Sequence, residues 1–176
     1  VHPVPNDVNT DEPPVYAGWS LDGATRYNST SGGVFSELCR SVYQRSGAVA
    51  GAIYDENQMV KHIVSDEPSD LERMRQSKYV QSEIDDVYQR VKERLGKGQT
   101  VLFSGCPCQV EGLLSVLGER HPNLYTVDLI CRGRNSPKAY RKWLDMLETK
   151  FRGKVVRVWF RNKETGWNHS IARIDF

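Results

Sequence analysis

Residues 100–118, TVLFSGCPCQVEGLLSVLG, and residues 124–131, LYTVDLIC, specify the fold of this chain. The first stretch opens with an apolar run that is typical of a buried strand. After GCPCQ its apolar side chains recur at the spacing of an amphipathic helix, and Gly118 follows as a stop signal. The second stretch is another short apolar run. Together they predict a strand, a helix and a second strand.

Further elements are predicted before this unit. Residues 15–20, VYAGWS, alternate enough to form a strand, and residues 34–46 carry apolar side chains at helical spacing before Gly47. Residues 48–55 and 58–66 flank Glu56 and Asn57 as an antiparallel hairpin.

Three more elements complete the pattern. Residues 83–96 form the clearest amphipathic helix, for which we expect Gly96 to supply a left-handed stop. Another helix begins around Pro137, and two strands at residues 155–160 and 170–176 surround a polar turn. Alternating strands and helices, with hairpins added, predict an α/β fold with a mixed, partly parallel β-sheet and flanking helices.

The chain of 176 residues is long enough for a single domain with its own core. We expect residues 1–14, which are polar and proline-rich, to be a linker or the end of a preceding module, and residues 15–176 to form the functional module, incomplete at its C-terminal end. The 24 basic and 22 acidic side chains are well mixed, which does not indicate a nucleic-acid partner. No apolar run approaches the roughly 20 residues of a membrane span, so we expect a cytoplasmic protein.

Three loops are predicted to follow a strand and precede a helix: STSGG at 29–33, GCPCQ at 105–109 and CRGRNSP at 131–137. Each should then lie at the carboxyl end of its strand, which is the edge where open α/β sheets bind ligands. In the first loop, Ser31, Gly32 and Gly33 lead into a helix whose free amide groups could bind a phosphate. An ordinary serine cap with a flexible turn is the alternative.

The second loop places Cys106 and Cys108 at a helix start, a position that lowers the pKa of a thiol, and Cys131 ends the neighbouring strand. Three thiols at one edge favour a soft metal or an iron–sulfur cluster. The alternative is that two of them are small buried hydrophobic residues. Cys39 falls on the apolar side of its helix, and we assign it to the core.

Two polar segments are weaker candidates. In QSKYVQS, residues 76–82, Lys78 could neutralise a phosphate or a reduced flavin while Tyr79 stacks on a ring; a surface lysine beside a packed tyrosine is the commoner outcome. The turn at residues 161–168 holds Arg161, Lys163 and Trp167, which could face an anionic substrate or simply form a solvated turn.

The order of these motifs, RYNSTSGGVF, QSKYVQS, FSGCPCQVEGL, YTVDLICRGRNSP and FRNKETGW, resembles the coenzyme F-420 hydrogenase/dehydrogenase beta-subunit family from Tyr16 to the last residue. The motifs are most similar to those of stand-alone bacterial members, which are often attached to a ferredoxin-like module. Single motifs of this kind are modest signals, but five in the right order are specific.

The resemblance implies an oxidoreductase that uses FAD to pass electrons between a 4Fe–4S cluster and a hydride-accepting cofactor or small molecule, with a ferredoxin-like module or protein as electron partner. It implies no catalytic side chain, because the flavin carries the chemistry. By position, Cys108 and Cys131 match cluster ligands, and Cys106 stands where the family has threonine, as an extra ligand or a bystander. The segments that match the flavin site contain Ser31, Gly32, Gly33, Ser77, Lys78 and Tyr79.

The chain departs from the family pattern in two further ways. Arg132, Arg134 and Asn135 replace the usual residues of the CRGRNSP loop, which favours a more anionic partner. The ferredoxin cysteines are absent, so we expect this chain alone to be colourless or to bind flavin only weakly. The alternatives are a thiol-based metal or redox protein without flavin, using Cys106 and Cys108, and a non-catalytic scaffold in surface-polysaccharide synthesis.

Overall fold

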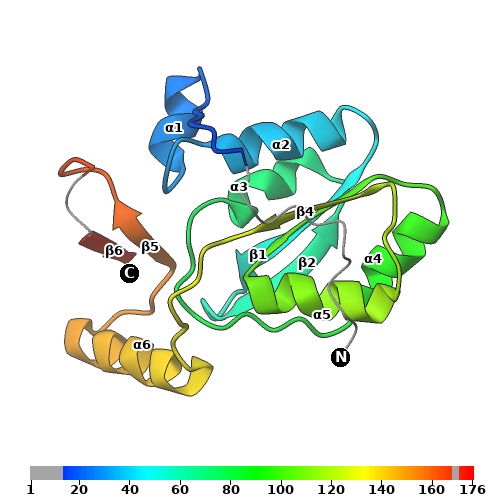
Figure 1. Ribbon diagram of the computed structural model, residues 1–176. Coiled ribbons are helices and arrows are strands. Elements are labelled where there is room, and N and C mark those ends of the chain that lie inside the picture. The colour runs from blue at the N-terminus through cyan, green and yellow to red at the C-terminus, as the bar shows by residue number, and fades with distance from the viewer. Residues whose placement is uncertain (1–13, 168–170) are drawn as a thin grey trace.

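The computed structural model describes residues 14–167 and 171–176, and Figure 1 shows helices packed around a central sheet. The helices are α1 (Gly23–Asn28), α2 (Val34–Tyr43), α3 (Leu71–Met74), α4 (Val87–Gly96), α5 (Pro107–Leu117) and α6 (Pro137–Phe151), with a short 3-10 helix η1 (Pro68–Asp70). The strands are β1 (Ala48–Tyr54), β2 (Val60–Ser65), β3 (Val101–Gly105), β4 (Leu124–Asp128), β5 (Arg157–Asn162) and β6 (Ile171–Asp175).

The central sheet has four strands in the order β2-β1-β3-β4. β1 and β2 form the predicted antiparallel hairpin, in which Gly51 lies opposite Ile63. β3 is parallel to both β1 and β4, with Val101 beside Ala48 on one side and Leu124 on the other. The fold is therefore α/β with a mixed, partly parallel sheet, as the sequence predicts.

Alternation of side chains along the strands divides the core between the two faces of the sheet. On one face Ala50, Val101 and Phe103 pack against α4 and α5. On the other face Val49 and Leu102 pack against α2 and α3. Helices thus lie on both faces of the sheet, while the edge strand β4 stays largely exposed.

β5 and β6 pair with each other in a separate antiparallel ribbon, next to α6 and α1 in Figure 1. A third core cluster joins this ribbon to the rest of the chain, because Val158 of β5 packs with Val60 of β2 and with Leu144 of α6. None of the described helices is long and apolar enough to cross a membrane.

The strand predicted at residues 15–20 is wrong. These residues have no regular structure, and the side chains of Val15 and Tyr16 are 91% and 86% exposed. A strand needs a neighbouring strand for its backbone groups, and the backbone-to-backbone bond made here runs from Ser20 N to Gly32 O, at 2.7 Å, in a loop. The alternating pattern carried no information about such a partner.

Two other boundaries also differ from the sequence prediction. Gly96 is the last residue of α4, and Gly98 takes the left-handed conformation instead, with φ of +77°. The cause is that Lys97 N still bonds back to Glu93 O, which prolongs the turn. β4 ends at Asp128 rather than at Cys131: the last bond to β3 is from Leu129 N to Gly105 O, and residues 129–131 have no regular structure beyond it.

Candidate functional site

The carboxyl ends of β3 and β4 lie side by side, and they bring two cysteines together. Gly105 and Asp128 are register partners at the ends of the two strands, and Leu129 N donates to Gly105 O at 2.9 Å. Cys106 follows the first strand directly, and Cys131 follows the second after two residues. This confirms the expectation that both loops share one edge of the sheet.

The thiol of Cys106 is half-buried at the start of α5. Burial, followed by a hydrogen bond with the Cys131 side chain, raises the pKa of Cys106. The expectation of a lowered pKa for Cys106 is therefore wrong, because desolvation and the neighbouring sulfur of Cys131 raise it. Cys131 is exposed, and its Sγ accepts a hydrogen bond from Gly133 N at 3.4 Å.

The thiols of this edge fit a metal centre only in part. Cys108 is exposed, one residue beyond the N-terminal Pro107 of α5. Cys39 is fully buried in the core under α2, where burial raises its pKa to about 12, so it belongs to the core as predicted. Among the described residues no three His, Cys, Asp or Glu side chains form a group that could hold a metal ion. The three thiols near the edge are also one fewer than the four ligands of a 4Fe–4S cluster.

A buried polar network lies directly behind these thiols. Gln109 Oε1 accepts a hydrogen bond from Cys106 N at 2.9 Å, and Gln109 Nε2 donates to Ser82 Oγ at 2.8 Å. Gln109 O accepts a third hydrogen bond from the hydroxyl of Tyr88. This role was not predicted from the sequence, although a glutamine three residues after a helix cap is a known capping signal.

His62 contacts the end of β3, the strand that leads into this loop. Its Nε2 lies 3.0 Å from Ser104 O, and because a carbonyl only accepts, this nitrogen carries the proton. The imidazole stacks on Phe103, with ring centroids 5.7 Å apart. Burial lowers the pKa of His62, so the neutral ring is the favoured form.

The STSGG loop reaches the site by a different route from the one predicted. It follows α1 rather than a strand, and the N-cap of α2 is Gly33, with φ of +87°, rather than a serine. A side chain at Gly32 would come within 2.8 Å of Gly18 O. Both glycines are thus required by the packing of this loop on residues 18–20.

Three contacts between segments distant in sequence assemble the candidate site. Ser77 N donates to Thr30 Oγ1 at 2.8 Å, which joins the QSKYVQS segment to the STSGG loop. Asn135 Nδ2 donates to Tyr79 O at 3.1 Å, which joins the same segment to the CRGRNSP loop. The contact between Leu129 and Gly105 then links that loop to GCPCQ. We call this continuous line of loops the loop rim.

Lys78 is not the surface lysine that its polar neighbours suggest. Its Nζ donates to three carbonyl oxygens at the end of α3, those of Met74 at 3.3 Å, Arg75 at 2.7 Å and Gln76 at 3.3 Å. The ammonium also lies 5.5 Å from the centre of the Tyr54 ring. Burial lowers the pKa of Lys78 to about 7. Tyr79, by contrast, is 42% exposed and packs its ring edge-to-face with Phe160.

The turn after β5 folds onto the STSGG loop. Lys163 Nζ donates to Arg26 O at 2.6 Å and to Ser31 O at 3.2 Å, and it lies 4.7 Å from the centre of the Trp167 ring. Burial lowers the pKa of Lys163. This lysine therefore contacts the loop rim, from a turn whose residues 164–167 are exposed. Arg132 and Arg134, in the CRGRNSP loop, are exposed.

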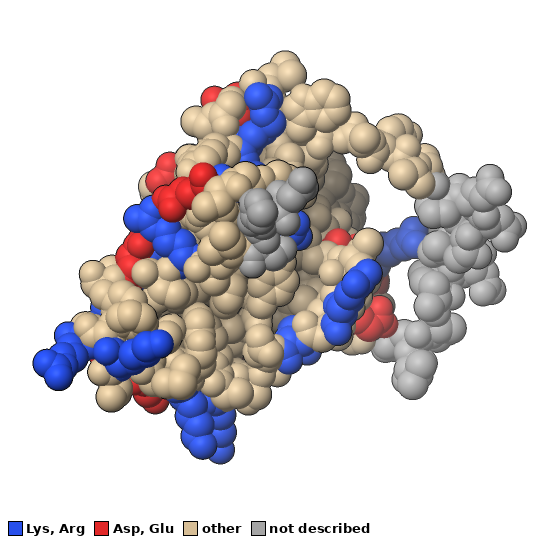
Figure 2. Space-filling model, turned by 90° about the vertical axis from the view of Figure 1, so that its left-hand side faces the viewer, with Lys and Arg blue, Asp and Glu red and all other residues tan. Residues whose placement is uncertain are grey.

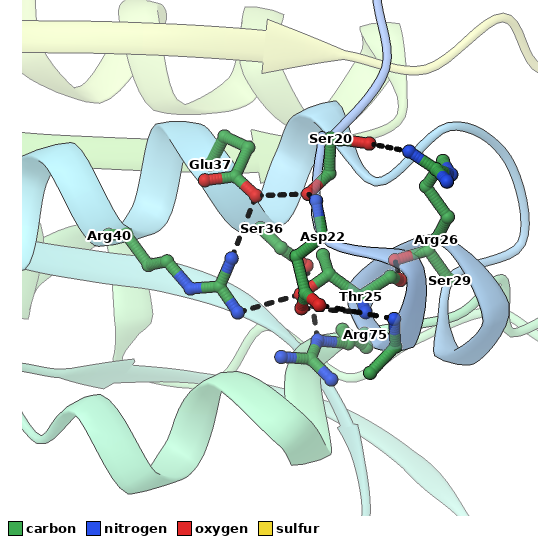
Figure 3. Close-up of polar contacts among 10 residues, drawn as sticks. Ser20, Asp22, Thr25, Arg26, Ser29, Ser36, Glu37, Arg40 and Arg75 are labelled. Carbon is green, nitrogen blue, oxygen red and sulfur yellow. Dashed lines mark hydrogen bonds and ion pairs between the residues drawn. The ribbon is translucent and has the colours of Figure 1, made fainter.

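A polar network behind the STSGG loop fixes α1 against α2 (Figure 3). Asp22 caps α1 by accepting hydrogen bonds from Ala24 N and from both N and Oγ1 of Thr25. Arg40 of α2 donates to the same Thr25 hydroxyl at 2.8 Å and forms an ion pair with Glu37. These bonds hold the loop in one conformation, because each buried hydroxyl has a partner.

The fold and the loop rim together define an α/β protein. Its rim thiols, and the exposed arginines of the CRGRNSP loop, lie beyond the carboxyl ends of β3 and β4. Residues 98–174 match the family described as the C terminus of the coenzyme F420 hydrogenase/dehydrogenase beta subunit. This match supports an F420 hydrogenase beta-subunit-like family, as the order of motifs indicated. No curated protein matches the chain.

A solved structure shows the same fold. It is a chain of the F420-reducing NiFe hydrogenase complex from Methanosarcina barkeri, determined after xenon derivatization, with a TM-score of 0.60 and 18% identity. The alignment covers 89% of the present chain and 57% of that chain. The present chain thus spans little more than half the length of that hydrogenase subunit.

Proposed function

We propose that this protein is a flavin-dependent electron-transfer module that binds FAD along the loop rim. The observation that carries the proposal is the direct contact between the loop rim segments, in which the Thr30–Ser77 and Tyr79–Asn135 hydrogen bonds join three motifs. FAD would supply hydride and single-electron chemistry when bound. The protein's contribution is to bind the flavin and to exclude water from it.

The rim offers suitable groups for an anionic cofactor. α2 begins at Gly33 without a side-chain cap, so its first amide groups are available to a phosphate. Ser31, Gly32 and Ser77 lie beside this terminus, and Lys163 adds a positive charge next to Ser31. Lys78 and the exposed ring of Tyr79 lie in the same segment as Ser77.

The cysteines support an iron–sulfur partner that this chain does not complete alone. We assign Cys108 and Cys131 as ligands, with Cys106 as a third, because these thiols lie at neighbouring strand and helix ends. Cys39 is in the core, so further ligands would have to come from outside the chain, and a ferredoxin-like module or protein is the proposed source. Three thiols do not complete a four-ligand cluster, so we assign no electron-transfer step through one.

The exposed Arg132 and Arg134 favour an anionic partner at the same edge. Two candidates carry that charge: a small anionic hydride acceptor and an acidic electron-transfer protein. Both would approach Cys131, which precedes these arginines in the chain. This loop therefore forms the proposed docking point for the partner in electron transfer.

The hydrogen bond between Cys106 and Cys131 also favours a second candidate function, a thiol-based metal or redox protein that needs no flavin. In this alternative the working pair is Cys106 with Cys131, rather than Cys106 with Cys108. The discriminating property is flavin retention. A protein of the second kind would bind metal or form a disulfide and would show no affinity for FAD.

Anaerobic reconstitution with iron, sulfide and FAD, in the presence of a ferredoxin-like protein that supplies the missing cluster ligands, tests the proposal. Iron, sulfide and flavin per chain are measured for the wild type, Cys108→Ala and Cys131→Ala, with Cys39→Ala as a control that removes a thiol outside the rim. We expect flavin binding in all four proteins and less iron in the two rim variants. Flavin absent from the wild type, together with zinc bound through Cys106 and Cys131, would favour the second function instead.

A further inference from the structure

A cavity of about 340 Å³ lies between the end of α3, the end of β1 and the start of β5. We call it the α3–β5 cavity. Four cationic side chains line it: Arg73, Arg75, Lys78 and Arg157. Glu72 is the acidic residue in the same lining. The cysteines and the Ser31–Gly33 turn are not part of the lining, so the cavity is distinct from the loop rim, with which it shares the segment around Lys78.

The cations that line the cavity are only partly neutralised. In the described part of the chain, Arg73 is the member of the four that forms a salt bridge, with Asp70 at 2.8 Å. Arg157 lies over the ring of Trp159 at 4.8 Å, and Arg75 Nε donates to the hydroxyl of Ser36 at 3.1 Å. The contacts of Arg157 and Arg75 orient their guanidinium groups without cancelling their charge, because a ring and a hydroxyl carry no net charge. Figure 2 shows Lys and Arg side chains protruding from the face that faces the viewer, with fewer Asp and Glu side chains among them.

Hydrogen bonds across the cavity walls fix its shape. Gln76 Nε2 donates to Asn28 O at 3.1 Å, which ties the end of α3 to α1. Gln58 Nε2 donates to Val156 O at 3.0 Å, which ties the β1–β2 turn to the start of β5. Walls held by bonds between distant segments do not need to reorganise when a ligand enters.

Half-buried Lys78, which lies in the same lining, gives a second indication of an anion. Its Nζ is held by three carbonyl oxygens, which carry only partial negative charge, and burial lowers its pKa to about 7. An anion in the cavity would supply the full negative charge that the ammonium lacks. The guanidinium groups in the lining would add charge-assisted hydrogen bonds, because the planar arginine fork matches phosphate oxygens.

We propose that the α3–β5 cavity binds a phosphate-bearing small molecule. Arg73, Arg75 and Arg157 contact the phosphate, and Lys78 adds a positive charge to the lining. This phosphate can come from two sources: the diphosphate of FAD, if the flavin places it here rather than at the start of α2, or a separate phosphate ligand. The first source rests on the proposed function, and the second does not. The chemistry of the cavity is the same in both cases.

Isothermal titration of the chain with inorganic pyrophosphate at low salt tests the site itself. The variant is Arg73→Gln with Arg157→Gln, because both side chains reach the surface and neither is part of the polar network of Figure 3. The charge-matched control is Lys92→Gln with Lys97→Gln at the end of α4, outside the cavity lining. Circular dichroism checks that all three proteins are folded.

We expect the wild type and the control to bind pyrophosphate, and the cavity variant to bind about tenfold more weakly or worse, because two charge-assisted contacts are lost. A wild type that does not bind, or a folded cavity variant that binds as tightly as the control, would overturn the proposal. A separate titration with FAD, in the presence and absence of pyrophosphate, distinguishes the sources. Competition identifies the flavin diphosphate, and pyrophosphate binding without competition identifies a separate ligand, even if FAD does not bind at all.

Discussion

Gln109 holds the backbone of Cys106 in place, because its Oε1 accepts the hydrogen bond of Cys106 N at 2.9 Å while its Nε2 donates to buried Ser82. The glutamine is itself buried, so its two hydrogen bonds are shielded from water. The position of the Cys106 thiol, and hence the spacing of the rim thiols, depends on this side chain.

Replacing Gln109 by alanine removes both hydrogen bonds and leaves Cys106 N and the Ser82 hydroxyl without their partner. We expect the free energy of unfolding to fall by about 2–4 kcal/mol, measured by denaturant titration. Gln89→Ala, at an exposed position of α4, is the control and should change it by less than about 0.5 kcal/mol. Equal stability of the two variants would mean that Gln109 does not hold the loop.

The two glycines at the end of α4 should respond oppositely to alanine. Gly96 is helical and has open space around it, so Gly96→Ala should raise the free energy of unfolding by about 0.5–1 kcal/mol. Gly98 has φ of +77°, so Gly98→Ala should lower it by about 1 kcal/mol. Thermal unfolding of both variants measures the difference. If Gly96→Ala instead lowers the free energy of unfolding, Gly96 rather than Gly98 provides the left-handed stop.

His62 should make the protein sensitive to mild acid. Burial lowers its folded pKa below the usual 6.5, so the unfolded chain binds more protons between these two values. The stability that neutral His62 provides is therefore complete above about pH 6.5 and is lost as the pH falls towards the folded pKa. His62→Gln keeps a donor for Ser104 O but does not titrate, so its stability should fall less between pH 7 and 5 than that of the wild type. His121→Gln is the control, and a wild-type slope retained in His62→Gln would contradict the prediction.

Lys78 should make the free energy of unfolding rise with pH above neutrality. Its folded pKa of about 7 lies below the unfolded value of 10.5, so the unfolded chain binds more protons in this window and stability rises with pH. We expect the free energy of unfolding of the wild type to rise between about pH 7 and 8.5, relative to that of Lys78→Met, by at most about 1.4 kcal/mol per pH unit. Urea titrations of both proteins across this range measure the difference. Parallel curves would show that Lys78 is not desolvated.

Local sequence patterns were enough to predict the elements that carry their own periodicity. The hairpin of β1 and β2, α5 with its stop at Gly118, and α6 from Pro137 all form as expected. The apolar runs of β3 and β4 also predicted their neighbouring carboxyl ends, because parallel pairing follows from the intervening helix. Strand alternation failed at residues 15–20, where pairing with another strand was needed and is not found.

The candidate site itself depends on contacts that no local pattern contains. Thr30 meets Ser77 across 47 residues, and Lys163 meets Ser31 across 132 residues. The raised pKa of Cys106 likewise depends on burial and on Cys131, which the position at a helix start could not reveal. The loops of the candidate site could therefore be predicted from the sequence. The contacts between them could be seen only in the tertiary structure.

Equilibrium binding of FAD to the chain is the decisive measurement for the proposed flavin site. Gly33→Val blocks the positive φ at the start of α2, and Gly98→Val imposes the same backbone strain at the end of α4, away from the rim. We expect saturable binding of one FAD per chain to the wild type and to Gly98→Val, and much weaker binding to folded Gly33→Val. No saturable binding to the wild type up to about 1 mM FAD, which corresponds to a binding free energy of about −4 kcal/mol, would contradict the flavin proposal.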